Sequence, residues 1–342
     1  MSVPIKPARS YADELLQRFR TQGDPPADHV IDSIAKTKGV GGIRQLMSWL
    51  IKPTHVETDV AEQEAIRHFF VEQNQLPTWA DWEKMKLGMA VFQQHGRQIG
   101  LILGCFSLPY CYLGANGAQV LWLTERIKKD TARRLQETGD WLFGVSTRNE
   151  WETGKAIQRT LTVRLIHACA RWFVQHSGRW QDDWGLPVNQ EDMAGTNLAF
   201  SYIVLRGLRK LDTTLSEEQE EGFLHHFNVV GYLNGIAEEL LPQNLRQAYL
   251  LDRAIVRRQF RPSDAGKGLT SALLDAIAQQ PNGEKSTKTD RPEAVRNLAA
   301  GEMRFFLGDQ YADWLAIPPV PVEKRFVNVL NRLPIFSNSV YS

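Results

Sequence analysis

A single histidine between two arginines is the feature of this sequence with the clearest chemical potential. Arg164, His167 and Arg171 are spaced by three and four residues within an apolar stretch. Residues three and four apart share one face of an α-helix, so these side chains form a single stripe with Ala168. A neutral imidazole is a common metal ligand, and guanidinium groups bind carboxylates. The stripe therefore presents one metal ligand between two cations.

Arg134 and Thr138 form a second pair with helical spacing. Four residues apart, they lie on one face and can point into one cavity. In an apolar pocket, an arginine and a hydroxyl can hydrogen-bond bound dioxygen or its reduced forms, or bind a carboxylate. Glu137 points to a different side of the same helix. The alternative is a surface arginine and a threonine inside a helix.

These residue types together are compatible with a haem site. Haem in a helical pocket needs a neutral imidazole on iron, small residues beside the macrocycle, and cations near its propionates. His167 and Ala168 meet the first two needs, and Arg164 and Arg171 are candidates to pair with propionates. Thr196, directly after Gly195, lies where the backbone can approach a cofactor closely. The alternative is that His167 is a core histidine with a satisfied hydrogen bond, as most isolated histidines are.

Other reaction classes lack motifs in this sequence. A di-iron bundle requires Glu-x-x-His on two helices, whereas Glu64 and His68, like Glu221 and His225, are one residue too far apart. The chain contains no Gly-x-Ser-x-Gly, P-loop or Gly-x-Gly-x-x-Gly pattern. Hydrolase, NTPase and dinucleotide-binding functions are therefore disfavoured.

Composition indicates a soluble, cytoplasmic protein. The 342 residues are 43% hydrophobic and carry 40 basic and 39 acidic side chains, a balance that does not favour nucleic acid as a partner. The most apolar segment, Ile99 to Leu108, is about half as long as a membrane span, so we expect no stable membrane insertion. Three cysteines without a Cys-x-x-Cys pattern predict buried free thiols. We find no export signal at the N-terminus.

Hydrophobic periodicity near 3.6 residues predicts an all-α chain that forms one domain over residues 1–342. Thr78 is a candidate N-cap, Pro109 is expected to end a central apolar helix, and Ser216 with Gln219 fits a capping box. The expected helices cover approximately residues 11–20, 28–38, 43–50, 60–73, 79–94, 99–108, 126–143, 151–176, 188–210, 217–239, two or three segments within 245–278, 294–307 and 321–333.

The order of several motifs resembles the family of MpaB-type oxygenases and latex clearing proteins (rubber oxygenases). The resemblance covers about residues 23–242, and helices in 245–342 are expected to pack on that part. It implies an all-α fold with a globin-like helical core and additional surrounding helices. The motifs are Leu-Pro-Thr-Trp at 76–79, Ser-Leu-Pro at 107–109, Arg-Leu-Gln-Glu-Thr at 134–138, Val-Arg-Leu-Ile-His-Ala at 163–168, Asn-Gln-Glu-Asp-Met-Ala-Gly-Thr at 189–196 and Val-Gly-Tyr-Leu-Asn-Gly at 230–235.

The resemblance also implies a chemistry. Latex clearing proteins bind one haem b through a single histidine, which matches His167, and use dioxygen to cleave carbon–carbon double bonds in polyisoprene. Their Arg-x-x-Lys-Thr pattern matches Arg134 and Thr138. This chain has Glu137 in place of the lysine, so we expect no lysine ligand on iron. Glu125 is the nearest candidate for the catalytic glutamate of the rubber enzymes.

The expected function is therefore a haem b-dependent oxygenase acting on a small apolar, unsaturated substrate, such as an isoprenoid or lipid. Rubber oxygenases are secreted and this chain shows no export signal, which favours an intracellular substrate over a solid polymer. The alternatives are a haem protein without oxygenase activity, such as a sensor or a peroxidase-like protein, and a metal-free helical lipid-binding protein. The sequence leaves the oligomeric state open.

Overall fold

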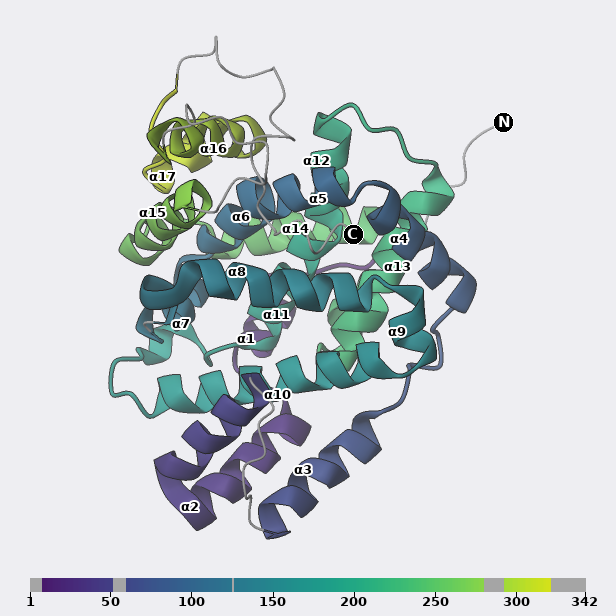
Figure 1. The fold of residues 1–342 in the computed structure, drawn as a ribbon, viewed down its shortest axis with the longest axis vertical. Coiled ribbons are helices and arrows are strands. Elements are labelled where there is room, and N and C mark those ends of the chain that lie inside the picture. The colour runs from purple at the N-terminus through teal and green to yellow at the C-terminus, as the bar shows by residue number, and fades with distance from the viewer. Residues whose placement is uncertain (1–7, 52–59, 125, 280–291, 321–342) are drawn as a thin grey trace.

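The computed structural model describes residues 8–51, 60–124, 126–279 and 292–320, where the regular structure is helical (Figure 1). In these ranges the β-type pairing is one isolated antiparallel bridge between Gly114 and Phe260. The all-α prediction is confirmed; the single-domain prediction stays a prediction. The helices are α1 (Asp13–Arg20), α2 (Pro25–Ile51), α3 (Val60–Gln73), α4 (Trp82–Gln94), α5 (Gly96–Ile102), the π-helix η1 (Leu103–Ser107), α6 (Leu108–Tyr112), α7 (Ala115–Leu123), α8 (Arg126–Val145), α9 (Arg148–Glu152), α10 (Lys155–Gln175), η2 (Asp182–Trp184), α11 (Gln190–Phe200), α12 (Tyr202–Lys210), α13 (Glu217–Leu233), η3 (Glu238–Leu240), α14 (Leu245–Gln259), α15 (Asp264–Gln279), α16 (Pro292–Leu307) and α17 (Asp309–Trp314).

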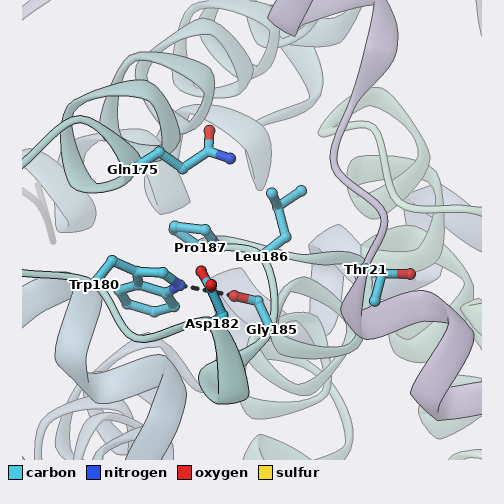
Figure 2. A pocket seen from close by; sticks show the side chains of 7 residues that line it. All are labelled: Thr21, Gln175, Trp180, Asp182, Gly185, Leu186 and Pro187. Atoms are coloured by element: carbon cyan, nitrogen blue, oxygen red, sulfur yellow. Dashed lines mark hydrogen bonds between the residues drawn. The ribbon is translucent and has the colours of Figure 1, made fainter. Parts of the chain in front are cut away.

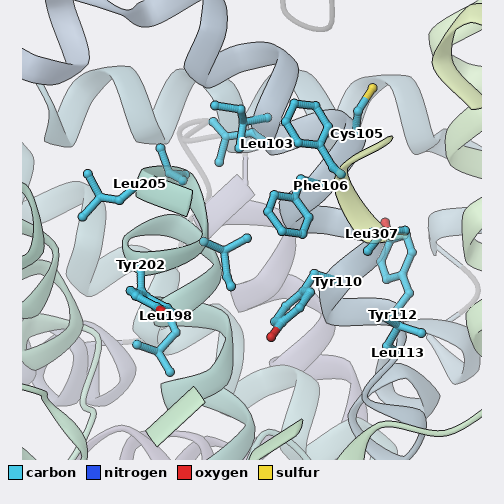
Figure 3. Close-up of a cluster of buried hydrophobic side chains, with 14 of the residues drawn as sticks. Leu103, Cys105, Phe106, Tyr110, Tyr112, Leu113, Leu198, Tyr202, Leu205 and Leu307 are labelled. Carbon is cyan, nitrogen blue, oxygen red and sulfur yellow. The ribbon is translucent and has the colours of Figure 1, made fainter. Parts of the chain in front are cut away.

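The largest apolar core joins the central helices to those of the C-terminal third. Phe106 of η1 stacks on Phe306 of α16 with ring centroids 5.4 Å apart, and Tyr110 of α6 packs edge-on against Phe260. Figure 3 shows Phe106 and Tyr110 within this core. Helix α15 packs on α6, α7, α8 and α16. The described C-terminal helices therefore pack on the preceding part of the chain.

Helices α2 and α3 form a separate apolar cluster with α10, at the lower edge of Figure 1. Its members are leucines, isoleucines and phenylalanines of α2 and α3, which bury the α10 side chains Leu161, Leu165, Ala168 and Cys169. Helix α10 contacts α8 on another side, so it lies between the α2–α3 pair and the rest of the molecule. The helix that carries His167 is therefore central.

Helices α4 and α13 approach each other closely because two glycines face each other. A Cβ on Gly88 would lie 2.7 Å from the carbonyl oxygen of Gly222 and 2.6 Å from Cβ of His226. His226 is 0% exposed. This contact therefore buries a histidine completely, beside the backbone of Val145.

Two expectations about helix ends were wrong. Pro109 does not end the central helix; the chain stays helical from Gly96 to Tyr112, because the π-turn redirects the Leu108 N–H to the Leu103 carbonyl and leaves Pro109 in a first turn, where no N–H is needed. The N-cap before α4 is Asp81 rather than Thr78, since its carboxylate accepts from the N–H groups of Glu83 and Lys84.

Several other local predictions are confirmed. Ser216 and Gln219 form the capping box of α13. The break expected between the helices at 28–38 and 43–50 is a kink at Gly39 (φ 61°) inside α2. The three cysteines are free, with Cys105 and Cys169 buried and Cys111 half-buried. The helix predicted at 321–333 lies outside the described residues.

Among the described residues, the helices lack the combination of length and hydropathy that crossing a bilayer requires.

Candidate functional site

His167 lies near the middle of α10, where its side chain is half-buried and its Nδ1 fully buried. Burial, reinforced by the positive charges of Arg171 and Arg134, lowers the pKa of its imidazole to about 4. The ring is therefore neutral at physiological pH, as a metal ligand must be. Its Nδ1 is buried and has no hydrogen-bond partner. The expectation of a core histidine with a satisfied hydrogen bond does not describe this nitrogen.

Arg164, one turn before His167, is 7% exposed and bound by groups of the N-terminal helices. Its Nε and Nη2 donate to the two carboxylate oxygens of Asp24 over 2.5 and 2.7 Å, and its Nη1 donates to Gln73 Oε1 over 3.0 Å. The guanidinium also lies 5.6 Å from the ring centroid of Phe69. Arg164 therefore joins α10 to the residue before α2 and to the end of α3.

Arg171, one turn after His167, is 2% exposed and has a similar set of partners. It forms a short ion pair with Asp28 of α2 and donates to the carbonyls of Pro187 and Val188 over 3.2 and 2.9 Å. The guanidinium groups of Arg164 and Arg171 thus bind carboxylates and carbonyls of the protein itself. Their predicted pairing with propionates stays a prediction.

Helix α8 carries the second predicted pair. The charge of Arg134 lowers the pKa of His167, so packing of α8 on α10 brings the two side chains within electrostatic range. Arg134 and Thr138 are both half-buried. Glu137 pairs instead with Arg133 over 2.9 Å, with both side chains about two-fifths exposed. The expectation that Glu137 points away from the Arg134–Thr138 face agrees with this pairing.

The same face of α8 carries a tryptophan that the sequence reading did not single out. Trp141 follows Thr138 by three residues, and its buried indole N–H has no hydrogen-bond partner. Its ring packs edge-on against Phe200, the last residue of α11. The helical spacing from Arg134 and Thr138 was the signal that would have identified it.

Thr196 lies on α11, and its hydroxyl donates to the Asp192 carbonyl one turn earlier over 2.9 Å. Burial raises the pKa of the nearby Cys111 thiol to about 12, and a hydrogen bond with Thr196 opposes that rise. Thr196 is itself exposed, on α11, which packs on α6. Its predicted part in cofactor binding stays a prediction, and Glu125 lies outside the described residues.

A surface pocket of about 370 Å³ lies beyond the C-terminal half of α10 (Figure 2). It begins near Gln175, eight residues or about 12 Å along the helix from His167. Its wall includes the loop whose Pro187 carbonyl accepts from Arg171. The pocket is therefore separate from His167. The lining residues are Thr21, Gln175, Trp180, Asp182, Gly185, Leu186 and Pro187.

At this position the protein offers one metal ligand, His167. A single ligand suits a metal whose other ligands come from a cofactor. Among the described residues, three or more His, Cys, Asp or Glu side chains do not gather into a metal-binding group. A neutral, desolvated imidazole with a buried nitrogen that lacks a partner fits the single protein ligand that haem requires. The residues at this position are therefore compatible with haem.

Aspartates of the N-terminal segment were also missed by the sequence reading. Asp24 and Asp28 lie some 140 residues before the arginines they bind. Their spacing of four, at the beginning of a predicted helix, matches an ordinary helix start, so only the tertiary contact distinguishes them.

The chain is similar to proteins of a known family. Residues 93–334 match the family model described as "ER-bound oxygenase mpaB/B'/Rubber oxygenase, catalytic domain". The rubber oxygenase of Streptomyces sp. (strain K30) is 22% identical over 275 residues, which are 77% of this chain and 63% of that protein. The chain thus spans less than two thirds of the length of this relative.

A solved structure has a similar fold. The structure titled "Structure of Latex Clearing Protein LCP in the closed state" superposes with a TM-score of 0.68 at 18% sequence identity, covering 92% of this chain and 80% of that one. At this identity the likeness concerns the fold alone.

Proposed function

This chain belongs to the family of mpaB-type and rubber oxygenase catalytic domains, and we propose that it is a haem b-dependent oxygenase. The observation that carries the proposal is His167, a neutral imidazole with a buried nitrogen that no protein group binds. The proposed substrate is a small apolar, unsaturated molecule, such as an isoprenoid or another unsaturated lipid. The proposed reaction uses dioxygen and cleaves a carbon–carbon double bond.

His167 would hold the iron of the haem. Its low pKa keeps the imidazole deprotonated across the physiological range, so protons do not compete with the metal. The bound haem supplies the activation of dioxygen, and the protein sets the axial ligand, the polarity and the access. Packing of α8 on α10 would shield His167 in part from water.

Arg134 and Thr138 would act on the oxygen or the substrate. A guanidinium within electrostatic range of His167 can stabilise negative charge that develops on oxygen, and the Thr138 hydroxyl can donate a hydrogen bond. Trp141 adds a buried N–H donor and an aromatic surface on the same face of α8. Alternatively, Arg134 steadies a propionate.

Hemin titration tests the cofactor. We expect the purified protein to take up hemin stoichiometrically, and His167→Ala to lose it or to shift its absorption spectrum. His176→Ala is the matched control. His176 directly follows α10, is exposed, and stacks on Trp172 of that helix. A colourless protein that cannot take up hemin, or iron coordination unchanged in His167→Ala, refutes the proposal.

Turnover tests the reaction. Short terpenes incubated with hemin-loaded protein under ¹⁸O₂ should give carbonyl products that contain the label. Bound hemin without labelled product would instead favour a haem protein that is not an oxygenase.

A further inference from the structure

The arginines on either side of His167 are each bound to an aspartate from outside the family-matched region. Asp24, 3% exposed, binds Arg164, and Asp28 binds Arg171. The two aspartates are also linked, since the Asp24 N–H donates to Asp28 Oδ2 over 2.9 Å. We call these four residues the arginine–aspartate clasp. The family model begins only at residue 93.

Two glycines next to the clasp leave room for its side chains. Gly235 follows α13 with φ +85°, and a Cβ there would lie 2.6 Å from Arg164 Nε and closer still to the Asp24 carboxylate. At Gly23 a Cβ would lie 2.6 Å from Asp28 Oδ2. Gln190 joins the two positions, because its side-chain amide donates to the carbonyls of Gly23 and Gly235 over 2.8 Å each. The clasp is thus held at the junction of α2, α10, α11 and α13.

His167 is oriented through the helix that carries it. Its Nδ1 is buried and has no hydrogen-bond partner, which leaves this nitrogen free for a metal. Helix α10 is bound to the rest of the protein one turn before His167, through Arg164, and one turn after it, through Arg171. These two attachments fix the direction in which the imidazole points.

We propose that Asp24 and Asp28 are positioning residues for His167: through Arg164 and Arg171 they hold α10 so that the imidazole is presented to the metal without a hydrogen bond to its ring. This inference rests on the proposed function. It makes the segment before α2 part of the cofactor site, although that segment lies outside the matched oxygenase domain.

Two sets of variants, each with its own control, separate positioning from stability. Asp24→Asn and Asp28→Asn remove the charge but keep the shape. Asp252→Asn is the control, because Asp252 is 4% exposed, accepts from Tyr110 over 2.6 Å and pairs with Arg206, all away from the clasp. Gly235→Ala crowds the clasp without changing charge. Gly308→Ala is its control, with φ +81° and no atom within 4 Å of the added Cβ.

The main measurements are hemin affinity, the electron paramagnetic resonance spectrum of the loaded protein, and its melting temperature. We expect Asp24→Asn, Asp28→Asn and Gly235→Ala to weaken hemin binding about 10-fold and to shift the spectrum. The controls should lower the melting temperature comparably but leave affinity and spectrum unchanged. Clasp variants whose hemin binding and spectrum match those of controls of equal stability would overturn the proposal.

Hydrogen exchange in the hemin-free protein gives an independent measurement. Amide exchange across residues 164–171 should be faster in Asp24→Asn than in Asp252→Asn. If the wild-type chain takes up no hemin, the proposed function fails, and this exchange still shows whether the clasp holds α10. Equal exchange in the two variants would refute the clasp.

Discussion

At the scale of single residues, desolvation decides which side chains are available for chemistry. Arg164 and Arg171 resemble cofactor ligands in sequence but bind Asp24 and Asp28. His167 resembles a core histidine, yet its Nδ1 lacks a partner. A buried polar atom without a hydrogen bond costs about 1–3 kcal/mol, and binding a metal would remove that cost at His167.

Substitution of Arg134 is predicted to affect turnover more than cofactor binding. With hemin bound by His167, Arg134→Met should lower kcat about 100-fold, because a charged donor beside the reacting oxygen is lost. Arg133→Met is the matched control, since the neighbouring Arg133 pairs with Glu137 on the exposed side of α8. Steady-state kinetics on hemin-loaded variants would measure this, and equal kcat losses in both variants would contradict the assignment.

Thr138→Val should lower kcat by a smaller factor, about 10-fold, because a neutral hydroxyl contributes less than a guanidinium. Valine has nearly the shape of threonine, so folding should be retained. The same kinetic measurements, with hemin content recorded, would test it; unchanged kcat would exclude Thr138 from the reaction.

At the scale of elements, close packing of helices positions the site. Helix α10 is held between the α2–α3 pair and α8. Helix α13 is followed by Gly235, whose lack of a side chain leaves room for the clasp. Helix α13 in turn packs on α4 through Gly88 and Gly222. A change at the α4–α13 contact should therefore act on stability first.

Gly88→Ala is predicted to destabilise the protein by about 2 kcal/mol, because the added methyl group would overlap the Gly222 backbone and His226. Gly195→Ala provides the contrast. There the nearest atom lies at 3.6 Å, an ordinary contact, and alanine is favoured over glycine inside a helix by about 1 kcal/mol. Urea denaturation of both variants would measure the difference; two changes of the same sign and size would contradict it.

At the scale of the whole molecule, buried histidines couple stability to pH. Burial lowers the pKa of His226 to about 3 and that of His167 to about 4, well below the usual 6.5. In the unfolded chain both rings take up protons as the pH falls below 6.5, whereas in the folded protein they stay neutral. The unfolded state therefore gains stability on acidification.

We accordingly expect the free energy of unfolding to fall as the pH is lowered from 6.5 to 5, by about 1.4 kcal/mol per pH unit for each of these histidines. Burial raises the pKa values of Asp28, Glu191 and Asp252, and these carboxyl groups change stability in the opposite direction, so the histidine contribution is measured as the difference between the wild type and His226→Leu. His226→Leu should reduce the slope, and a slope unchanged by this substitution would contradict the prediction.

The sequence by itself determined the helical class, several helix caps and the stripe that contains His167, because periodicity, capping and side-chain chemistry are local properties. Its motif order also indicated the oxygenase family. The sequence wrongly predicted that Pro109 ends the central helix, because the π-turn that accommodates this proline depends on packing rather than on local preference. Only the tertiary structure decided what Arg164 and Arg171 bind, because Asp24 and Asp28 reach them across a sequence separation of some 140 residues that no local pattern records.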